Sequence, residues 1–465
     1  GSVSKGPGLA GSVNARYKTV DFSRGTRFTP SGDVTFIGRA ADASTAIGGI
    51  VGTSNDQFRI HVLGSWEEGD NLKFPDGEIA NTFHDRQVLG GGAGVRTRDG
   101  HHSLSFDFRR HETGETGNPP FAMDIEYIEG DFARAAYEGK FDGFRINLDF
   151  GSVDIGHGMT NYLSRPAPVM MKQRRTIANG ETRTASARLT KPMKGGELRL
   201  GVDYEQNDHN VLITNPNDPD FFLNSLPDIT MERSGLFAEW YRDTDTGGVE
   251  IGLRMDHLSA ESRPATVGSA VPMMPAMLAM SFSMQDRTWD DTTVDAVLQS
   301  WRDINDPVTL RGTLARKNRA PGYVERFAWL PTPASGGLAD GNTYVGDLEL
   351  KPETALIVDF GADVRFSRLT ARPTIFYRRI DDFIQGVPFD TTVGVVDSTV
   401  EMVSSMNGDP TPLRFENVDA RLFGADLDFS WMASDQVQVD GGLSWVRGER
   451  RDISDDLYRI APLRG

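Results

Sequence analysis

The sequence has 465 residues, of which 49 are Lys or Arg and 66 are Asp or Glu, so the formal net charge is −17. This acidic balance argues against a nucleic-acid partner, because phosphate binding needs a basic surface. The lack of cysteine excludes disulfide frameworks, thiolate zinc sites and cysteine nucleophiles within this chain. No window approaches 18 consecutive apolar residues, which excludes a transmembrane helix.

Apolar and polar residues alternate with a period of two in many segments, and this pattern predicts half-buried strands. In chain order the clearest cases are Leu104–Arg109, Phe144–Phe150, Glu197–Glu205, Val249–Asp256, Leu422–Trp431 and Val437–Trp445. The segment Gly90–Gly94 lacks the strand–helix context of a dinucleotide-binding loop and is predicted to be a strand of small residues. Because helical periodicity is rare, we predict an all-β fold.

The polar face of these strands is rich in Asp and Arg, as in Asp107, Arg109, Arg254 and Asp256. The outer face of a soluble β-sandwich can be equally charged. In a transmembrane barrel, however, the charged face lines a wet lumen and the apolar face meets lipid. Aromatic residues near several strand ends fit an interfacial girdle, and they fit equally well the ordinary preference of strands for aromatic residues.

The connections alternate in length, from tight turns such as 98–100 to long loops at 112–121, 156–176, 214–229 and 261–286. Short turns at one end and long loops at the other are typical of outer-membrane barrels. We therefore predict one antiparallel transmembrane β-barrel with long extracellular loops and short periplasmic turns. At about 20–25 residues per strand and connection, the chain holds about 18–20 strands.

Both ends of the sequence bear on this prediction. Residues 1–8 have no charged n-region or apolar h-region and do not form a signal peptide. The last residues, 458–465, stop where another strand should begin. Because an open sheet edge cannot lie in lipid, we expect an incomplete barrel that does not insert as a closed barrel by itself.

Four segments resemble the barrel of TonB-dependent outer-membrane receptors. They are Arg319–Pro331, Leu348–Thr354, Phe376–Gly386 and Phe415–Asp426. The resemblance covers essentially the whole chain and implies a plugged barrel of 22 strands in the outer membrane of a Gram-negative cell. It assigns residues 1–8 to the tail of a missing plug domain and residues 9–465 to a barrel that lacks its closing C-terminal strands.

Within this superfamily the chain is most similar to the copper receptors, which carry a His-x-Met pair in the barrel and a Cys-x-x-x-Met pair in the plug. Here the barrel pair is His157 and Met159. The resemblance makes this pair half of a copper site at the lumen-facing base of a loop. Imidazole and thioether form a soft donor set that suits Cu(I) and tolerates Cu(II).

The spacing of His157 and Met159 is compatible with one shared metal ion, since residues two apart in an extended segment point the same way. The alternative from spacing alone is a loop His and a loop Met with no ligand role. The Cys-containing half of the site would belong to the plug, upstream of this sequence.

Further methionines follow, at Met170 and Met171 and at Met273, Met274, Met277, Met280 and Met284. Four members of the second group stand at helical spacing. The favoured interpretation is an amphipathic loop helix that uses Met as adaptable packing. The alternative is a low-affinity thioether relay that gathers copper above the pore, and the same two interpretations apply to the first group.

The resemblance implies a transporter rather than an enzyme, with no catalytic cofactor. Its cargo is a scarce nutrient, with copper favoured and a siderophore or another metal chelate as the alternative. The implied partners are the lipid bilayer with its lipopolysaccharide, the TonB energy-transducing complex acting through the missing plug, and the metal ion or chelate. Two other classes stay open: a soluble all-β surface-binding protein, for which a repeat of about 40–50 residues is expected but not seen, and a passive porin.

Overall fold

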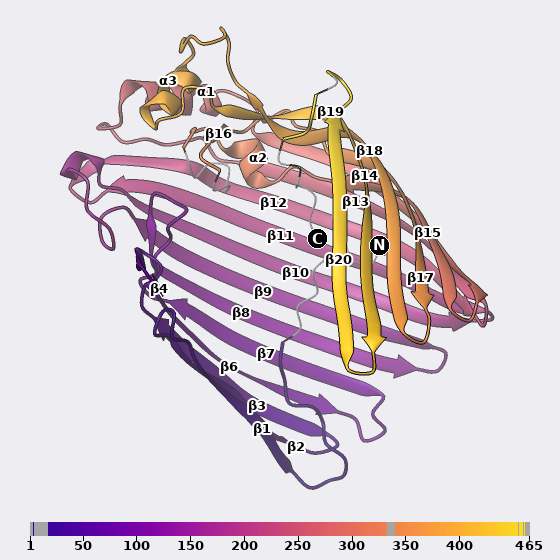
Figure 1. The fold of residues 1–465 in the computed structure, drawn as a ribbon. Helices are drawn as coiled ribbons and strands as arrows, with labels where there is room; N and C mark the ends of the chain where they lie inside the picture. The colour runs from indigo at the N-terminus through magenta and orange to yellow at the C-terminus, as the bar shows by residue number, and fades with distance from the viewer. Residues whose placement is uncertain (1–2, 4–16, 333–339, 454, 459, 461–465) are drawn as a thin grey trace.

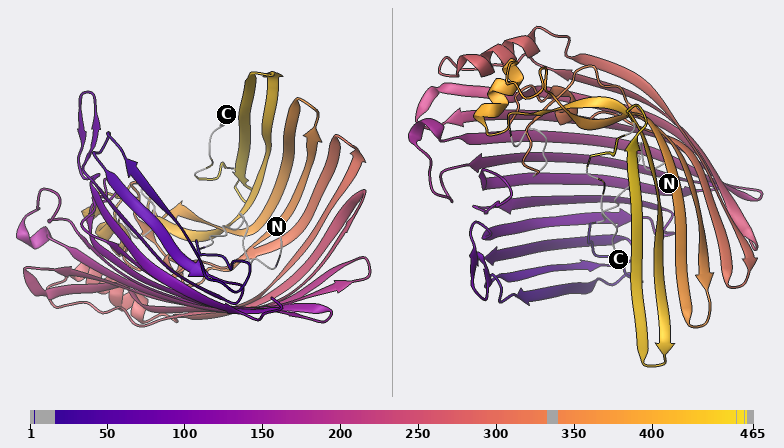
Figure 2. Two further views of the ribbon diagram at one scale, coloured as in Figure 1. Left: turned by 90° about the horizontal axis from the view of Figure 1, so that it is seen from below. Right: turned by 45° about the horizontal axis from the view of Figure 1, so that its top comes forward.

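The computed structural model describes residues 3, 17–332, 340–453, 455–458 and 460. Their strands form one sheet of 18 strands and a separate two-stranded hairpin. The sheet curls into a deep trough with its loops and helices gathered at one end (Figures 1 and 2). Of the residues assigned to the plug, only Val3 lies within the described ranges.

The strands of the large sheet are β1 (Thr29–Gly38), β2 (Thr45–Ser54), β3 (Phe58–Gly69), β6 (His84–Arg96), β7 (His102–Thr113), β8 (Asp124–Phe141), β9 (Phe144–Thr160), β10 (Arg175–Met193), β11 (Gly196–Asn215), β12 (Asp218–Thr244), β13 (Gly247–Ser262), β14 (Thr288–Asn305), β15 (Val308–Arg319), β16 (Tyr344–Val345), β17 (Glu353–Arg365), β18 (Leu369–Pro388), β19 (Leu413–Ser434) and β20 (Val437–Arg450). The hairpin is β4 (Leu72–Phe74) with β5 (Gly77–Ile79). The helical segments are η2 (Met170–Lys172), α1 (Met273–Ser283), α2 (Tyr323–Phe327) and α3 (Thr399–Met406).

The large sheet is a meander in which successive long strands pair antiparallel; the short strand β16 pairs parallel with β19. Among the described residues, β1 pairs only with β2 and β20 only with β19. The two edges stand well apart in Figure 2. The prediction of an all-β barrel sheet of about 18–20 strands is therefore confirmed, and the sheet that the described residues form is open between β1 and β20.

The alternation of side chains along β13 identifies the two faces of the sheet. Leu253 is 57% exposed and Met255 is 53% exposed, whereas Arg254 and Asp256 are at most 2% exposed. A water-soluble protein does the reverse, because burying charge costs free energy and exposing contiguous apolar surface favours association. Apolar residues outside and charged residues inside are the arrangement of a transmembrane barrel. None of the described helices has the length and apolar character needed to cross a bilayer.

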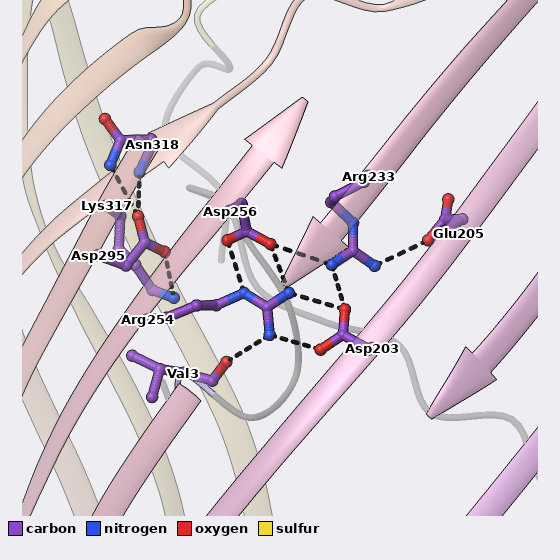
Figure 3. A network of polar contacts seen from close by, with 9 residues as sticks. All are labelled: Val3, Asp203, Glu205, Arg233, Arg254, Asp256, Asp295, Lys317 and Asn318. Carbon is purple, nitrogen blue, oxygen red and sulfur yellow. Dashed lines mark hydrogen bonds and ion pairs between the residues drawn. The ribbon is translucent and has the colours of Figure 1, made fainter. Parts of the chain in front are cut away.

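The inner face of β11, β12 and β13 carries a buried network of charges (Figure 3). Arg254 donates to both oxygens of Asp256, at 2.7 and 2.5 Å, and to both oxygens of Asp203, at 2.8 Å each. Arg233 also contacts both carboxylates. The carbonyl oxygen of Val3 lies 3.5 Å from the Arg254 guanidinium. Each charge in the network thus has an opposite partner, as a desolvated lumen wall requires.

The connections confirm that one end of the sheet has short turns and the other has long loops, with one exception. The predicted tight turn at 98–100 joins β6 to β7, and long loops follow β7, β9, β13, β15 and β18. The predicted loop at 214–229 is wrong, because only a tight turn at 215–218 separates β11 from β12. The predicted loop at 156–176 is shorter than expected, since β9 continues to Thr160. The pair β9–β10 and the pair β11–β12 therefore extend beyond the span that a bilayer requires.

An apolar core lies at the long-loop end, between the strand extensions and the three helices. It contains Ile229 of β12, Leu278 and Phe282 of α1, Phe327 of α2 and Val403 of α3. These loops therefore have a packed interior of their own. That interior holds α1 and α2 at the long-loop end of the sheet (Figure 1).

Candidate metal site

His157 and Met159 lie near the upper, long-loop end of β9, where both side chains face the lumen. On either side of β9, Ile128 of β8 and Ala178 of β10 stand opposite His157. The strand alternation that turns Phe150 outward, where it is 54% exposed, turns every odd-numbered residue of β9 inward. The prediction that the two donors point the same way is therefore confirmed, on a strand and not on a loop.

The outward-facing residues at this height show where the bilayer ends. Asp154 on β9 stands opposite Asp131 on β8 and Glu181 on β10. Three carboxylates on the outer face cannot lie in hydrocarbon without a large energetic cost. His157 and Met159, which are further along the strand, consequently lie outside the membrane-spanning part of the sheet.

The imidazole of His157 is half-buried and has no hydrogen-bond or ion-pair partner among the residues that the structure describes. Burial lowers the pKa of His157 below the ordinary value for histidine, because an apolar environment disfavours the charged ring. At neutral pH the ring is therefore uncharged. This is the form in which imidazole binds a metal ion.

A third soft donor, Met123, lies beside this pair and was missed by the sequence analysis. The hydroxyl of Thr176 on β10 donates to the Met123 sulfur at 3.4 Å, and Thr176 is the cross-strand partner of Met159. Since Met123 precedes β8 and β9 lies between β8 and β10, the Met123 side chain reaches across the position of Met159. Only the register of the three strands reveals this proximity.

The loop that follows β9 is fastened beside the site by one buried ion pair. Arg165 donates to both oxygens of Asp124, at 2.7 and 2.5 Å, and the backbone N–H of Asn118 donates to the same carboxylate at 2.9 Å. Asp124 is the cross-strand neighbour of Thr160 at the end of β9. The pair therefore sets where the Met-rich segment leaves the strand.

We expect this fastening to fail only in acid. Burial opposes ionisation of Asp124, but the hydrogen bonds from Arg165 and Asn118 outweigh burial and hold the pKa of Asp124 below its ordinary value. A lowered pKa gives stabilisation that is complete above the ordinary value of about 3.9 and lost as pH falls through the lower, folded-state value. Pepsin should therefore cut within 161–174 only below about pH 4.

An Arg165→Ala variant should expose the same loop to pepsin already at pH 5, which is about one pH unit above the value at which cleavage of the unaltered protein should begin. Arg183→Ala is the matched control, because its exposed pair with Glu181 lies on the outer face. Cleavage at pH 5 in the unaltered protein would contradict the role given to Asp124.

Met170 and Met171 form part of η2, in the loop after β9. The carbonyl oxygen of Met170 accepts a hydrogen bond from Asn215 at 3.2 Å, and that of Met171 accepts one from Arg174 at 2.8 Å. Their backbone is thereby held, while their side chains are 63% and 82% exposed. The packing role considered for these two methionines is wrong.

The predicted helix over the second methionine group exists as α1, but its packing face is not the one expected. Leu278, Ala279 and Phe282 are buried in the loop core, with Met274 partly buried against it. The other four methionines are between 49% and 76% exposed; they are Met273, Met277, Met280 and Met284. The interpretation of these four as packing residues is wrong, because the apolar residues between them take that role.

The three groups of thioethers belong to one end of the molecule without forming one cluster. His157, Met159 and Met123 face the lumen, whereas η2 and α1 present sulfur to solvent. Arg174, next to η2, stacks on Phe221 at 3.9 Å, and Phe221 belongs to the same apolar core as α1. Within the described residues, no group of three or more His, Cys, Asp or Glu is arranged to hold a metal ion.

Three of the four segments that carried the family resemblance, Arg319–Pro331, Leu348–Thr354 and Phe376–Gly386, meet at one partly buried ion-pair network. Arg319 donates to Glu325 of α2 at 2.9 and 3.1 Å and to Glu353 of β17 at 2.8 and 2.7 Å. Glu353 also accepts the backbone N–H of Ile384 at 2.8 Å. The network thus fixes α2 above the lumen.

This placement of α2 brings an aromatic ring onto a second lumen-facing histidine. The Tyr323 ring stacks on His209 of β11 with centroids 3.9 Å apart and planes at 19°. Burial lowers the pKa of His209, although the negative charge of Asp208 partly opposes this shift. Burial also raises the pKa of Tyr323. His209 is therefore uncharged and covered.

The architecture and the sequence agree on a family. Residues 76–465 match the TonB dependent receptor-like, beta-barrel family. The chain belongs to this family. TonB-dependent receptors are outer-membrane proteins of Gram-negative cells and act as transporters, so the soluble-protein and passive-porin alternatives do not describe this chain.

Several solved receptors share the fold. The "Copper transporter OprC" superposes with a TM-score of 0.76 at 17% identity and covers 96% of this chain and 67% of its own. The alcaligin receptor FauA of Bordetella pertussis superposes with a TM-score of 0.58 at 11% sequence identity, and the match covers 93% of this chain and 62% of FauA. The siderophore receptor PirA of Pseudomonas aeruginosa superposes with a TM-score of 0.58 at 14% sequence identity, and the match covers 92% of this chain and 68% of PirA.

These TonB-dependent receptors resemble the chain in fold and differ in the cargo that their names give. At such low identity the fold alone is shared. The chain spans less than two thirds of the length of FauA. No match is found among curated proteins.

Proposed function

We propose that this TonB-dependent receptor imports copper. The observation that carries the proposal is the donor set on the lumen wall, in which His157 and Met159 project from one face of β9 and Met123 lies across Met159. One imidazole and two thioethers form a soft set, which favours Cu(I) over Mg²⁺, Ca²⁺ or Fe(III). The similarity to the copper transporter OprC supports the same cargo.

In this proposal the exposed methionines of α1 and η2 collect copper before it reaches the lumen. Met273, Met277, Met280 and Met284 occupy the solvent face of α1. Each isolated thioether binds weakly and exchanges quickly, which suits a collecting surface better than a storage site. Because the imidazole of His157 is uncharged, His157 and Met159 together bind copper more tightly than the isolated methionines do.

Energy for import would come from the TonB complex, which acts on a plug that precedes the barrel in the sequence. The outward apolar face of the sheet contacts the lipid bilayer and its lipopolysaccharide. The receptor performs no catalysis in this scheme, so copper is a transported ligand and not a resident cofactor.

The alternative cargo is a siderophore or another metal chelate, and the similarity to FauA and PirA favours it. A chelate receptor would recognise the organic ligand rather than the bare ion. Binding of the bare ion through His157 and Met159 therefore separates the two proposals.

Titration of the full-length receptor with Cu(I) tests the site. Loss of second-shell partners already changes metal affinity by about 10–100-fold, so His157→Ala or Met159→Ala should weaken Cu(I) binding by about 100-fold. Met123→Ala should weaken it less, because this side chain has Thr176 as a competing partner. Met193→Ala is the matched control, since this exposed thioether ends β10 at the short-turn end.

Unchanged Cu(I) affinity in the His157→Ala and Met159→Ala variants would overturn the copper site. Tight binding of a ferric chelate by both variants and by the unaltered receptor would favour the alternative cargo.

A further inference from the structure

The segment Tyr17–Ser23, called the strap below, crosses the inner face of the sheet on its way to β1 (Figure 1). Arg109 of β7 donates to the carbonyl of Lys18 at 2.9 Å, and Arg59 of β3 donates to the carbonyl of Val20 at 3.2 Å. The hydroxyl of Ser23 donates to the carbonyl of Ser54 on β2 at 2.8 Å. The strap thus runs over β7, β6, β3 and β2 in turn.

Arginines hold the aromatic residues of the strap as well as its backbone. Phe22 has the Arg59 guanidinium at 5.0 Å from its ring centre and that of Arg96 at 4.5 Å. Tyr17 has the Arg109 guanidinium at 4.0 Å. No residue of the strap belongs to a described strand. Separate side-chain contacts therefore hold the strap, and a β-ladder does not.

The wall beneath the strap is hollowed by the glycines of β6. A Cβ atom at Gly92 would lie 2.4 Å from Oδ1 of Asp107 and 2.7 Å from Cε1 of His61. A Cβ atom at Gly94 would lie 2.6 Å from Nε of Arg59 and 3.2 Å from the Phe22 ring. Bare backbone on the inner face of β6 thus lets side chains of β3 and β7 meet across it.

The residues that meet in this hollow are His61 and Asp107. The His61 Nε2 and Asp107 Oδ1 atoms are 3.4 Å apart, and the side chains are 1% and 10% exposed. Within the described residues, both ring nitrogens of His61 and Oδ1 of Asp107 lack a hydrogen-bond partner. The pair lies between Arg59 and Arg109, so the strap that joins these arginines crosses above it.

Two opposing terms therefore act on the strap. The arginine contacts favour the closed position. The buried polar atoms of His61 and Asp107 favour an open position, because water could then hydrogen-bond to them. The contacts of the strap and the unsatisfied polar groups beneath it therefore act on its position in opposite directions.

We propose that the strap is a releasable cover of a polar site on the lumen wall. In its closed position it hides His61 and Asp107, and in its open position it admits water to them. Within the import cycle, and on the basis of the proposed function, tension on the chain before Tyr17 breaks the arginine contacts one after another. Release of the strap then opens a hydrated path along β3, β6 and β7.

Thiol labelling of the full-length receptor tests the cover directly, since residues 1–465 contain no cysteine of their own. The rate at which a maleimide modifies His61→Cys, located by mass spectrometry, reports the open fraction. Phe22→Leu keeps an apolar side chain but loses two cation–π contacts, so the rate should rise about tenfold. Arg96→Ala removes one of these contacts and should give a smaller increase.

Thr293→Cys on β14 is the matched control, because it is a buried lumen position away from the strap. Its labelling should not change with Phe22→Leu. An equal acceleration at both cysteines would indicate general loosening and would overturn the cover, as would an unchanged rate at His61→Cys.

Labelling in cells separates the cover from its part in import. His61→Cys should react faster in cells with an active TonB complex than in cells without one. Acceleration by Phe22→Leu without any TonB dependence would support the cover and overturn its role in import. Neither result depends on copper as the cargo.

Discussion

Arg254→Ala is expected to destabilise the folded barrel by about 3–5 kcal/mol, since removing one partner of a buried ion pair leaves uncompensated charge. The Arg254 side chain is completely buried and donates four hydrogen bonds to Asp203 and Asp256. Without it, two carboxylates would share the single guanidinium of Arg233. Urea unfolding of the full-length receptor in detergent micelles, followed by tryptophan fluorescence, measures the effect.

The matched control is Arg134→Ala on β8. Arg134 and Asp149 also form a pair on the inner face, at 2.6 Å, but their side chains are 44% and 41% exposed. Solvent screening limits such a pair to about 0–1 kcal/mol. Adding Asp203→Asn and Asp256→Asn to Arg254→Ala should restore part of the lost stability. Equal destabilisation by Arg254→Ala and Arg134→Ala would contradict the importance of burial.

The fold was predictable because a period of two is visible without any long-range information. Leu253 and Arg254 are adjacent in sequence, and their opposite burial in the structure is what alternation requires. The error at 214–229 has a local cause. The sequence Asn215-Pro216-Asn217-Asp218-Pro219 does specify a turn, but a tight one, and nothing local shows that β12 resumes immediately after it.

The candidate site was only partly predictable, for two physical reasons. His157 and Met159 are two residues apart, so alternation alone aligns them. Met123 joins them through the register of β8, β9 and β10, which a single sequence does not display. The sequence also does not show which face of α1 is exposed. Leu278 and Phe282 are as apolar as the methionines, so periodicity cannot choose between the two faces of the helix.

Arg319→Ala is expected to cost about 3–5 kcal/mol locally and to release α2 from the top of the lumen. Glu353 is 1% exposed and receives two hydrogen bonds from Arg319, which also holds Glu325. Arg319→Lys should behave almost as badly, because an ammonium group cannot bridge two carboxylates with parallel hydrogen bonds. Amide hydrogen exchange in 323–327 should accelerate in both variants.

The same experiment separates the structural role of this network from cargo binding. Released α2 would withdraw Tyr323 from His209, so the protection of His209 from chemical modification should be lost together with that of the helix. Cu(I) affinity at His157 and Met159 should change little, since neither residue contacts Arg319, Glu325 or Glu353 in the described structure. Normal exchange in α2 of Arg319→Ala would show that the apolar core alone holds the helix.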